Sequence, residues 1–483
     1  MTPVSADDHS FFGHPKALAT LFGVEMWERF SFYGMQGILL IYMYYTATQG
    51  GLGMDETVAA GIVGAYGGGV YLSTLLGGWI ADRVLGGERT LFYSAIMIMV
   101  GHLALAFLPG FVGLTAGLIF IAFGSGGLKA NATAVVGTLY SAEDERRDAG
   151  FSIFYMGINI GGLLGPLLTG LLQSNYGFHI GFAAAAVGMG AGLIQYSFGR
   201  KNLPAQAFEV ANPLAPAAQT KFIIFGALGL VAVGAAVALG VITPENLAQA
   251  VIVATIVATI IYFFVILGSA GLTAIERSRM FGFIPLFLAS VGFWSLYQQQ
   301  FTVLTIYADK ELDRKIFGWE MPVSWVQSIN PIFIIILSGV FAALWLKLGS
   351  RQPSTPVKFA LGTGLMGVAF LLFLPTVGGG PNSTPLAWMI FILFVFTVAE
   401  LCLSPVGLSV ATKLAPQRFR TQMVSLWFLS VALGTAISGQ LAGLYTKIPQ
   451  GDYFSIIGGI AIAIGVALLL GTKPILKLMK GVH

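Results

Sequence analysis

The fold of this chain is decided by one stretch, Glu25-Met-Trp-Glu-Arg-Phe-Ser-Phe-Tyr-Gly-Met-Gln36. It lies inside an apolar run from about residue 17 to residue 45, longer than the roughly 20 residues that a helix needs to cross a bilayer. Glu25, Glu28 and Arg29 place three ionisable groups within this run. Because a charge at the bilayer centre costs on the order of 3 kcal/mol, a helix that carries three must turn them towards protein or water.

The helical period divides this stretch into two faces. At about 100° per residue, one face carries Glu25, Glu28, Arg29, Phe32, Tyr33 and Gln36. The opposite face carries Met26, Trp27, Phe30 and Gly34. Glu25 and Arg29 are one turn apart, so an ion pair between them would lower the cost of burial.

Composition identifies a polytopic membrane protein. The chain has 483 residues, of which 56% are hydrophobic and 10% charged, whereas soluble domains average about 25% charged residues. Its basic residues sit in short loops between apolar spans and form no patch, so we expect no nucleic-acid partner. The sequence contains no phosphate-binding loop, no Cys/His metal spacing and no nucleophile elbow, and we therefore expect neither an enzyme nor a cofactor.

Apolar segments predict fourteen membrane spans, which puts both termini on one side. The predicted spans are residues 17–45, 55–81, 91–108, 111–139, 149–173, 180–199, 221–240, 246–268, 281–308, 323–348, 358–375, 387–412, 420–445 and 453–472. Of the 25 basic residues, 19 fall on the side of the termini and 4 on the other, namely Lys310, Arg314, Lys315 and Lys447. This bias predicts that both termini are cytoplasmic.

A polar, proline-bearing stretch at residues 201–220 separates six spans from the eight that follow. We expect residues 1–200 to form one six-helix bundle and residues 277–483 a second. Residues 201–276 would then hold a linker and an inserted hairpin of two spans. The hairpin carries no ionisable group at membrane depth, which favours a lipid-facing or spacer role.

Two glycine patterns bear on packing. The loop after the second predicted span, Gly77-Gly-Trp-Ile-Ala-Asp-Arg-Val-Leu-Gly-Gly-Glu-Arg-Thr90, resembles the signature loop G-x-x-x-D-R-x-x-G of the major facilitator superfamily. Its glycines permit a tight turn. The pairs Gly64/Gly68 and Gly161/Gly165 have the helical spacing at which small residues let helices pack closely.

Five ionisable residues lie deep in the predicted spans: Glu25, Glu28, Arg29, Lys129 and Glu400. Their gross insertion cost is on the order of 15 kcal/mol, so a purely structural role for all five is implausible. The three acids exceed the two bases by one, and one bound proton would neutralise the set, which makes it a candidate proton carrier. The two cations, Arg29 and Lys129, lie in the first predicted bundle, and Glu400 lies in the second. This separation suits a zwitterionic ligand, whose carboxylate would bind the cations and whose ammonium group would bind Glu400.

The motif E-x-x-E-R-F-x-x-Y-G-M at residues 25–35 resembles the first-helix signature of the proton-dependent oligopeptide transporters, a branch of the same superfamily. Similar segments continue over nearly the whole chain, at Gly127-Leu-Lys-Ala-Asn131, Phe151–Gly161, Gln327–Pro331 and Glu400–Pro405. The resemblance implies an all-α integral membrane protein with the major facilitator fold, with 14 spans as two six-helix bundles and an inserted hairpin. It also implies a monomer in the inner membrane of a bacterium.

The resemblance further implies roles for single residues. The carboxylate of a short peptide would be held by Arg29, Lys129 and Tyr33. Its amino end would be held by Asn159, Asn330 and Glu400. Side-chain pockets would be lined by Tyr71, Tyr155, Trp294, Ser404 and Trp427. Proton coupling would involve Glu25, Glu28, Arg29, Lys129 and Glu400.

The chain departs from the family pattern at an outer gate. Where the family usually has an arginine after Tyr-Gly-Met and a glutamate in the seventh helix, this chain has Gln36 and Gln298. Because both charges are absent, neither is left buried without its partner. We expect an amide contact between Gln36 and Gln298 to replace the ion pair. In addition, Phe32 stands where a tyrosine is common.

These observations favour a proton-coupled importer of di- and tripeptides that works by alternating access, with protons, short peptides and the bilayer as its partners. Two alternatives remain open. One is another facilitator-type carrier, such as a drug/proton antiporter or an anion transporter, although Glu400 argues against simple anions because they need no ammonium partner. The other is a receptor that transports nothing, and the buried charges argue against it.

Overall fold

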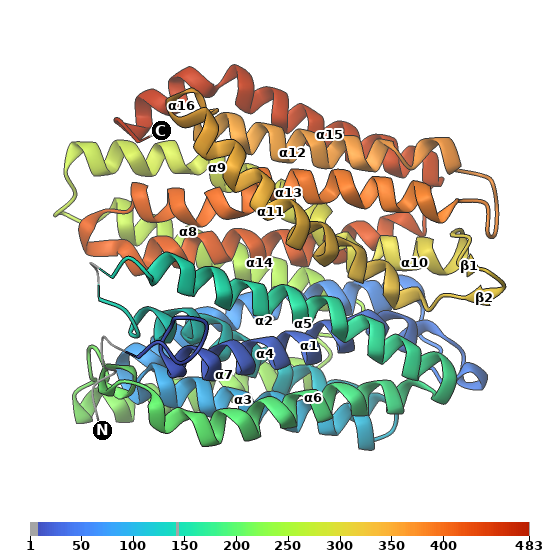
Figure 1. Ribbon diagram of the computed structural model, residues 1–483, viewed down its shortest axis with the longest axis horizontal. Helices are drawn as coiled ribbons and strands as arrows, with labels where there is room; N and C mark the ends of the chain where they lie inside the picture. The colour runs from blue at the N-terminus through green and yellow to red at the C-terminus, as the bar shows by residue number, and fades with distance from the viewer. Residues whose placement is uncertain (1–7, 142–143, 483) are drawn as a thin grey trace. The chain divides into compact units, whose positions relative to one another are not determined.

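The computed structural model describes residues 8–141 and 144–482, and it is built almost wholly of helices (Figure 1). Among these residues, thirteen helices are long and apolar enough to cross a membrane. Helix α1, Lys16–Tyr44, is not one of the thirteen, although its 29 residues exceed a bilayer's thickness. Its three clustered charges lower its mean hydropathy, so the fourteenth span stays a prediction.

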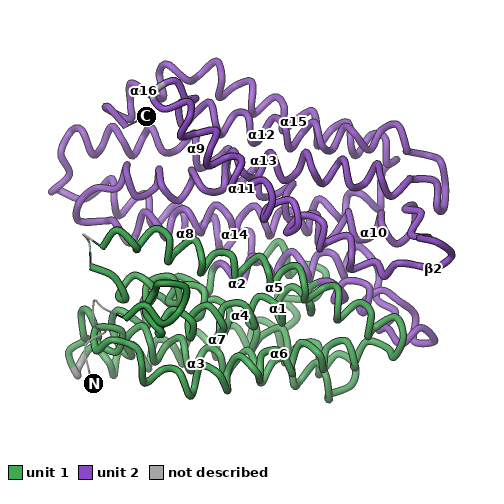
Figure 2. The backbone as a smooth tube through the Cα atoms, viewed as in Figure 1, with its two compact units in different colours: residues 1–36, 72–250 green, residues 37–71, 251–483 purple. Residues whose placement is uncertain are grey.

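Contacts divide the chain into two compact units, which are described separately (Figure 2). Unit 1 comprises residues 1–36 and 72–250, and unit 2 comprises residues 37–71 and 251–483. The division cuts α1, and it also cuts α2 (Glu56–Ile80) and α8 (Leu247–Leu267).

Unit 1 is a bundle in which α3 packs against α4 and α6, and α5 packs against α6. Besides its parts of α1, α2 and α8, it contains η2 (Ala81–Leu85), α3 (Gly87–Phe107), α4 (Gly110–Gly137), α5 (Arg147–Tyr176), α6 (Phe178–Gly199), η3 (Arg200–Asn202), η4 (Ala205–Phe208) and α7 (Pro216–Ala238). Its buried core combines side chains from five helices, including Leu18, Ile98, Leu128, Phe154 and Met189.

Glycines set the close approach of α5 to α1 in unit 1. A Cβ atom at Gly161 would lie 2.2 Å from the carbonyl oxygen of Met26, and one at Gly165 would lie 2.4 Å from that of Phe30. No other residue fits at such distances. The predicted packing role of this glycine pair is therefore confirmed.

The stretch predicted to be a linker makes backbone hydrogen bonds to the signature loop within unit 1. The loop is a π-helical turn, Ala81–Leu85, that ends at Gly86 with a φ of 83°. The backbone N–H of Asn212 donates to the carbonyl of Asp82 at 2.9 Å, and that of Leu214 donates to Arg83 at 3.0 Å. Helix α7 begins at Pro216 rather than at residue 221, because proline fits the first turn of a helix.

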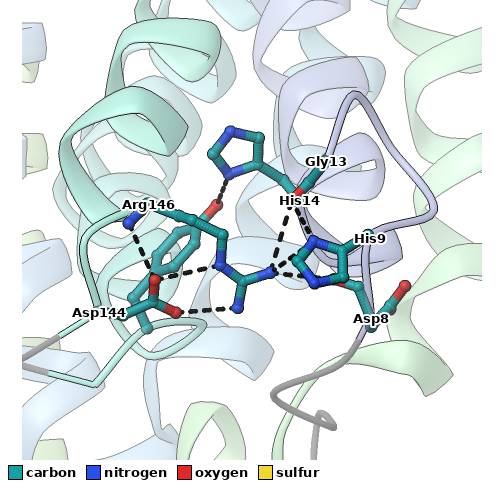
Figure 3. Close-up of polar contacts among 7 residues, drawn as sticks. Asp8, His9, Gly13, His14, Asp144 and Arg146 are labelled. Atoms are coloured by element: carbon teal, nitrogen blue, oxygen red, sulfur yellow. Dashed lines mark hydrogen bonds and ion pairs between the residues drawn. The ribbon is translucent and has the colours of Figure 1, made fainter.

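The segment before α1 is tied to the connection between α4 and α5 (Figure 3). The guanidinium of Arg146 donates to the carbonyl oxygen of Asp8 at 3.2 Å and forms an ion pair with Asp144 at 2.9 Å. The Nδ1 atom of His14 lies 2.9 Å from the hydroxyl of Tyr140. These contacts fix the entry of the chain into its first helix.

Unit 2 is a second bundle, in which α12 packs against α13 and α15, and α9 packs against α14. Besides its parts of α1, α2 and α8, it contains η1 (Ala47–Gln49), α9 (Ala274–Tyr297), η5 (Gln298–Phe301), α10 (Val303–Lys310), β1 (Lys315–Ile316), β2 (Trp319–Glu320), η6 (Val323–Ser328), α11 (Ile329–Leu348), η7 (Gly349–Arg351), α12 (Thr355–Leu371), η8 (Leu374–Thr376), α13 (Leu386–Leu414), η9 (Gln417–Phe419), α14 (Arg420–Tyr445), α15 (Gln450–Leu470) and α16 (Thr472–Met479). The single cysteine of the chain, Cys402, is buried in α13.

The predicted span over residues 281–308 lies within one candidate membrane span, Ala274–Lys310, but its helix is not regular throughout. The helix breaks at Thr302, where φ is −127° and ψ is −92°. Side chains donate hydrogen bonds to backbone carbonyls near the break. The amide of Gln299 donates to the carbonyl of Ser295 at 3.1 Å, and the hydroxyl of Thr305 donates to that of Gln300 at 2.9 Å. Satisfied in this way, an irregular backbone is tolerated at membrane depth.

Polar contacts bind the end of α1 and the start of α2 into unit 2. The hydroxyls of Tyr44 and Tyr45 donate to the carboxylate of Asp309 at 2.6 and 2.7 Å. Lys310 forms an ion pair with Glu56 at 2.5 Å.

The second glycine pair also packs helices, here within unit 2. A Cβ atom at Gly64 of α2 would lie 2.5 Å from the Cα atom of Gly439 in α14. One at Gly68 would lie 3.0 Å from the carbonyl oxygen of Ala432. The packing prediction for this pair is confirmed as well.

Candidate functional site

The charged groups of α1 are buried inside unit 1. Glu25, Glu28 and Arg29 are 2%, 0% and 3% exposed. The Nε atom of Arg29 lies 2.7 Å from Glu25 Oε1 and 3.0 Å from Glu28 Oε2. The predicted ion pair between Glu25 and Arg29 is confirmed, and a second acid shares the same nitrogen.

The opposite face of α1 explains this orientation. A Cβ atom at Gly188 of α6 would lie 2.4 Å from the ring of Phe30, and one at Gly192 would lie 2.7 Å from Trp27. These two large side chains therefore fill hollows over glycines in α6. With that face fixed, the helical period turns the charged face away from α6.

Helix α4 supplies the other half of the cluster. The hydroxyl of Ser125 donates to Glu28 Oε1 at 3.0 Å. One turn later, the Nζ atom of Lys129 lies 5.6 Å from the centre of the Phe32 ring, and the Cζ atom of Arg29 lies 6.0 Å from it. Unit 1 thus gathers two acids and two bases. Ser125 was missed in the sequence, although its i, i+4 spacing from Lys129 places the two on one helix face.

Two carboxylate oxygens in this cluster are poorly supplied with hydrogen-bond donors. Within the described residues, Oε2 of Glu25 is buried without one, and Oε2 of Glu28 is buried with only its ion pair to Nε of Arg29. An ionised oxygen buried in this way is costly, and a bound proton removes the cost. The geometry therefore allows the acids of α1 to take up a proton.

The remaining predicted residues of unit 1 lie on α1 and α5. On α1, Tyr33 is partly buried and Gln36 is 5% exposed. On α5, Tyr155 is 46% exposed, and Asn159 one turn later donates its side-chain amide to the carbonyl of Tyr155 at 3.0 Å.

In unit 2, Asn330 of α11 holds the carboxylate of Glu400 in α13. Its amide nitrogen donates to Glu400 Oε2 and to the hydroxyl of Thr397, both at 3.1 Å. The hydroxyl of Tyr297 donates to the amide oxygen of Asn330 at 3.4 Å. Within the described part of unit 2, Glu400 forms no ion pair with a basic side chain, so this acid carries the uncompensated charge of the predicted set.

The other predicted residues of unit 2 are Tyr71, Trp294, Gln298, Ser404 and Trp427. Trp427 is 4% exposed and lies over Gly407 of α13. The indole nitrogen of Trp294 is buried without an acceptor among the described residues. The ring of Tyr71 stacks on Phe428 with centroids 6.5 Å apart. Ser404 is partly buried.

The structure gathers Glu25, Glu28, Arg29 and Lys129 in unit 1, and it gathers Asn330 and Glu400 in unit 2. Thr397 and Tyr297 were not found from the sequence. Thr397 lies three residues before Glu400, a spacing that could have indicated it, whereas nothing in the sequence linked Tyr297 to this group. Gln36 belongs to unit 1 and Gln298 to unit 2, so their contact stays a prediction.

Membrane-length helices around buried acids and bases are the arrangement of a membrane carrier, and solved structures similar to this one give it the major facilitator fold. The model of the POT family matches residues 88–457. The chain belongs to this family, whose members are transporters and not enzymes. It is the family that the sequence motifs resemble.

Several proteins are similar to this one along their whole length. An uncharacterized transporter of Bacillus subtilis (strain 168), YclF, is 46% identical over 99% of this chain and 98% of its own. The di-/tripeptide transporter of Lactococcus lactis subsp. cremoris is 41% identical over 100% of both chains. A crystal structure of a peptide transporter POT in complex with sulfate superposes with a TM-score of 0.94, at 46% identity over 99% of this chain and 98% of its own.

Proposed function

We propose that this protein imports di- and tripeptides together with protons, by alternating access. It acts as a monomer in the cytoplasmic membrane of a bacterium, with both termini on the cytoplasmic side. The name of the Lactococcus lactis relative supports the substrate class, and the bias of basic residues in the loops supports the orientation.

The observation that carries this proposal is the division of buried charge between the two units. Unit 1 offers a guanidinium and an ammonium group, Arg29 and Lys129, to a carboxylate. Unit 2 offers a buried acid, Glu400, held by the amide of Asn330, to an ammonium group. A short peptide carries one group of each kind, and charge-assisted hydrogen bonds to both ends recognise it whatever its side chains are.

The remaining site residues would accommodate the rest of the peptide. Tyr33 supports the carboxylate end and Asn159 the amino end. Tyr71, Tyr155, Trp294, Ser404 and Trp427 line pockets for side chains, where aromatic walls suit many residue types. Gln36 and Gln298 form the gate.

Proton coupling would run through Glu25 and Glu28. Both acids share Nε of Arg29, and Glu25 keeps its second oxygen buried without a donor among the described residues. A peptide carboxylate that binds Arg29 and Lys129 competes with these acids for positive charge. The competition is relieved when one of them takes up a proton, so peptide and proton bind together.

Residues 1–200 and 277–483 would move as two six-helix bundles, and residues 201–276 would provide the linker and hairpin. None of the most apolar window of Ala218–Ala238 is buried, which supports a lipid-facing role for α7.

The test is uptake and counterflow of a labelled dipeptide in liposomes. We expect counterflow without a pH gradient, and accumulation only when the outside is more acidic. Counterflow without any acid-driven accumulation would contradict proton coupling. Transport of a drug or an inorganic anion in place of the dipeptide would favour another facilitator-type carrier, and binding without any flux would favour a receptor.

A further inference from the structure

Phe32 lies beside both cations of the charged cluster in unit 1. Its ring centre is 6.0 Å from Arg29 Cζ and 5.6 Å from Lys129 Nζ, and the residue is 7% exposed. A cation within about 6 Å of an aromatic face is attracted by the quadrupole of the ring. We propose that Phe32 is a positioning residue, which holds Arg29 and Lys129 in place to bind the carboxylate of a substrate. This inference rests on the proposed function.

The ion pairs of Arg29 leave its far end to be positioned. Glu25 and Glu28 both contact Nε, the guanidinium nitrogen nearest the main chain, so these ion pairs do not require the terminal amino groups. Lys129 carries its charge on a flexible four-carbon stem. Both cations therefore gain from a neighbour that fixes the position of the charged end.

A neutral ring suits this purpose better than a third acid. Arg29 and Lys129 are like charges in a buried site, where repulsion is stronger than in water. A carboxylate between them would offset the repulsion, but it would also compete with the carboxylate of the substrate. The face of Phe32 attracts both cations and adds no further carboxylate that would compete for their charge.

The ring is itself held in orientation. It meets the ring of Tyr33 edge to face, with centroids 5.4 Å apart and an interplanar angle of 88°. Because the side chain is buried as well, the direction of its face is set by packing. The attraction that the two cations feel therefore depends on the electron density of that face.

Fluorination tests this directly, because each fluorine weakens the quadrupole while nearly preserving the shape of the ring. We would place mono-, di- and trifluorophenylalanine at position 32 by nonsense suppression. The KM for a labelled dipeptide is expected to rise in step with fluorination, to about three- to tenfold for the trifluoro ring. The same series at Phe30 is the matched control, because Phe30 is 6% exposed on the same helix and packs on Trp27 at 5.5 Å.

Two further variants separate positioning from bulk. F32Y keeps an aromatic face and should keep the KM within about twofold, whereas F32L keeps an apolar side chain without a face and should raise the KM like the trifluoro ring. An unchanged KM across the fluorinated series and in F32L would overturn the proposal.

A second readout keeps this proposal distinct from the proposed function. The shift in Tm that sulfate gives beyond the general salt effect, measured against the same shift in the unsubstituted protein, reports on an anion bound at the two cations and needs no peptide transport. If fluorination at position 32 weakens sulfate stabilisation in a protein that transports no dipeptide, the proposed function fails and the positioning role stands. If neither sulfate stabilisation nor the dipeptide KM responds to the series, the positioning role fails.

Discussion

At the scale of single residues, the predicted buried acids of unit 1 have basic partners, whereas the predicted acid of unit 2 has none among the described residues. Glu25 and Glu28 face Arg29 and Lys129, whereas Glu400 has an amide for its partner. The sequence predicted the Glu25–Arg29 pair because both residues lie on one helix. It could not predict the partners that tertiary packing supplies, such as Ser125 for Glu28, because no local rule links α1 to α4.

Replacing either acid of α1 by its amide should uncouple transport from protons. In E25Q or E28Q, the side chain can no longer gain or lose a proton, so acid-driven accumulation should fall to the level of equilibration. Counterflow, which moves no net protons, should persist. Both are measured with a labelled dipeptide in liposomes.

E245Q serves as the matched control, because Glu245 is exposed in the connection before α8 and should be neutral in both assays. Unchanged acid-driven accumulation in E25Q and in E28Q would refute the coupling role.

The anchor of the N-terminal segment should weaken in acid. Burial, and then the charge of Arg146, lower the pKa of His14 below its ordinary value, so the folded protein favours neutral His14. Hydrogen bonds from Arg146 lower the pKa of Asp144, and this acid stays ionised over the relevant range. The stabilisation is thus complete above the unfolded-state pKa of about 6.5 and is lost as the pH falls through the lower folded-state value.

Hydrogen exchange measures this effect. The amides of Phe11 and His14, which pair with each other's carbonyls, should exchange faster at about pH 5.5 than at about pH 7.5, after correction for intrinsic rates. H14Q removes the titrating group and should remove this difference. A pH dependence that is equal in H14Q would assign the effect to another group.

At the scale of elements, long apolar runs were enough to place most helices. The prediction of residues 111–139 agrees with α4, Gly110–Gly137, to within two residues. The break at Thr302 was missed because no proline or glycine marks it, and side-chain hydrogen bonds stabilise it instead. The two-residue strands β1 and β2 are too short to give an alternating pattern.

The contact of α1 with α5 should not tolerate a methyl group. In G161A, the new Cβ atom would meet the backbone of Met26 at 2.2 Å and Arg29 Cβ at 2.8 Å, forcing the helices apart. We expect a loss of about 1–3 kcal/mol of stability, measured as a lower Tm in detergent, together with weaker dipeptide binding because Arg29 moves. G226A in α7, where no atom lies within 4 Å of the new Cβ, should leave both unchanged. An equal Tm for the two variants would show that α1 and α5 leave room for a methyl group at position 161.

At the scale of the whole molecule, the proposed gate pairs a glutamine of unit 1, Gln36, with a glutamine of unit 2, Gln298. Gln36 is 5% exposed and its amide oxygen has no donor among the described residues. Gln298 is 8% exposed and begins η5. Both side chains are neutral and buried. A charge introduced at one position alone would therefore be buried without a partner of opposite charge, unless the other position supplied one.

We therefore expect Q36R to reduce dipeptide transport more than the double variant Q36R/Q298E, in which the two charges can pair. The comparison uses initial rates of uptake at equal amounts of protein in the membrane. Equal damage in the single and double variants would count against a contact between the two positions.

The burial of Cys402 has a practical consequence for following this carrier at work. The residue is 5% exposed in α13, and a thiol buried among apolar groups reacts poorly with maleimides. A cysteine introduced at the fully exposed tip of the β1–β2 turn, at Phe317, would thus be the one site that such a reagent finds. A membrane-impermeant dye applied to intact cells would then report on which side of the bilayer that turn lies, with no background from the native chain.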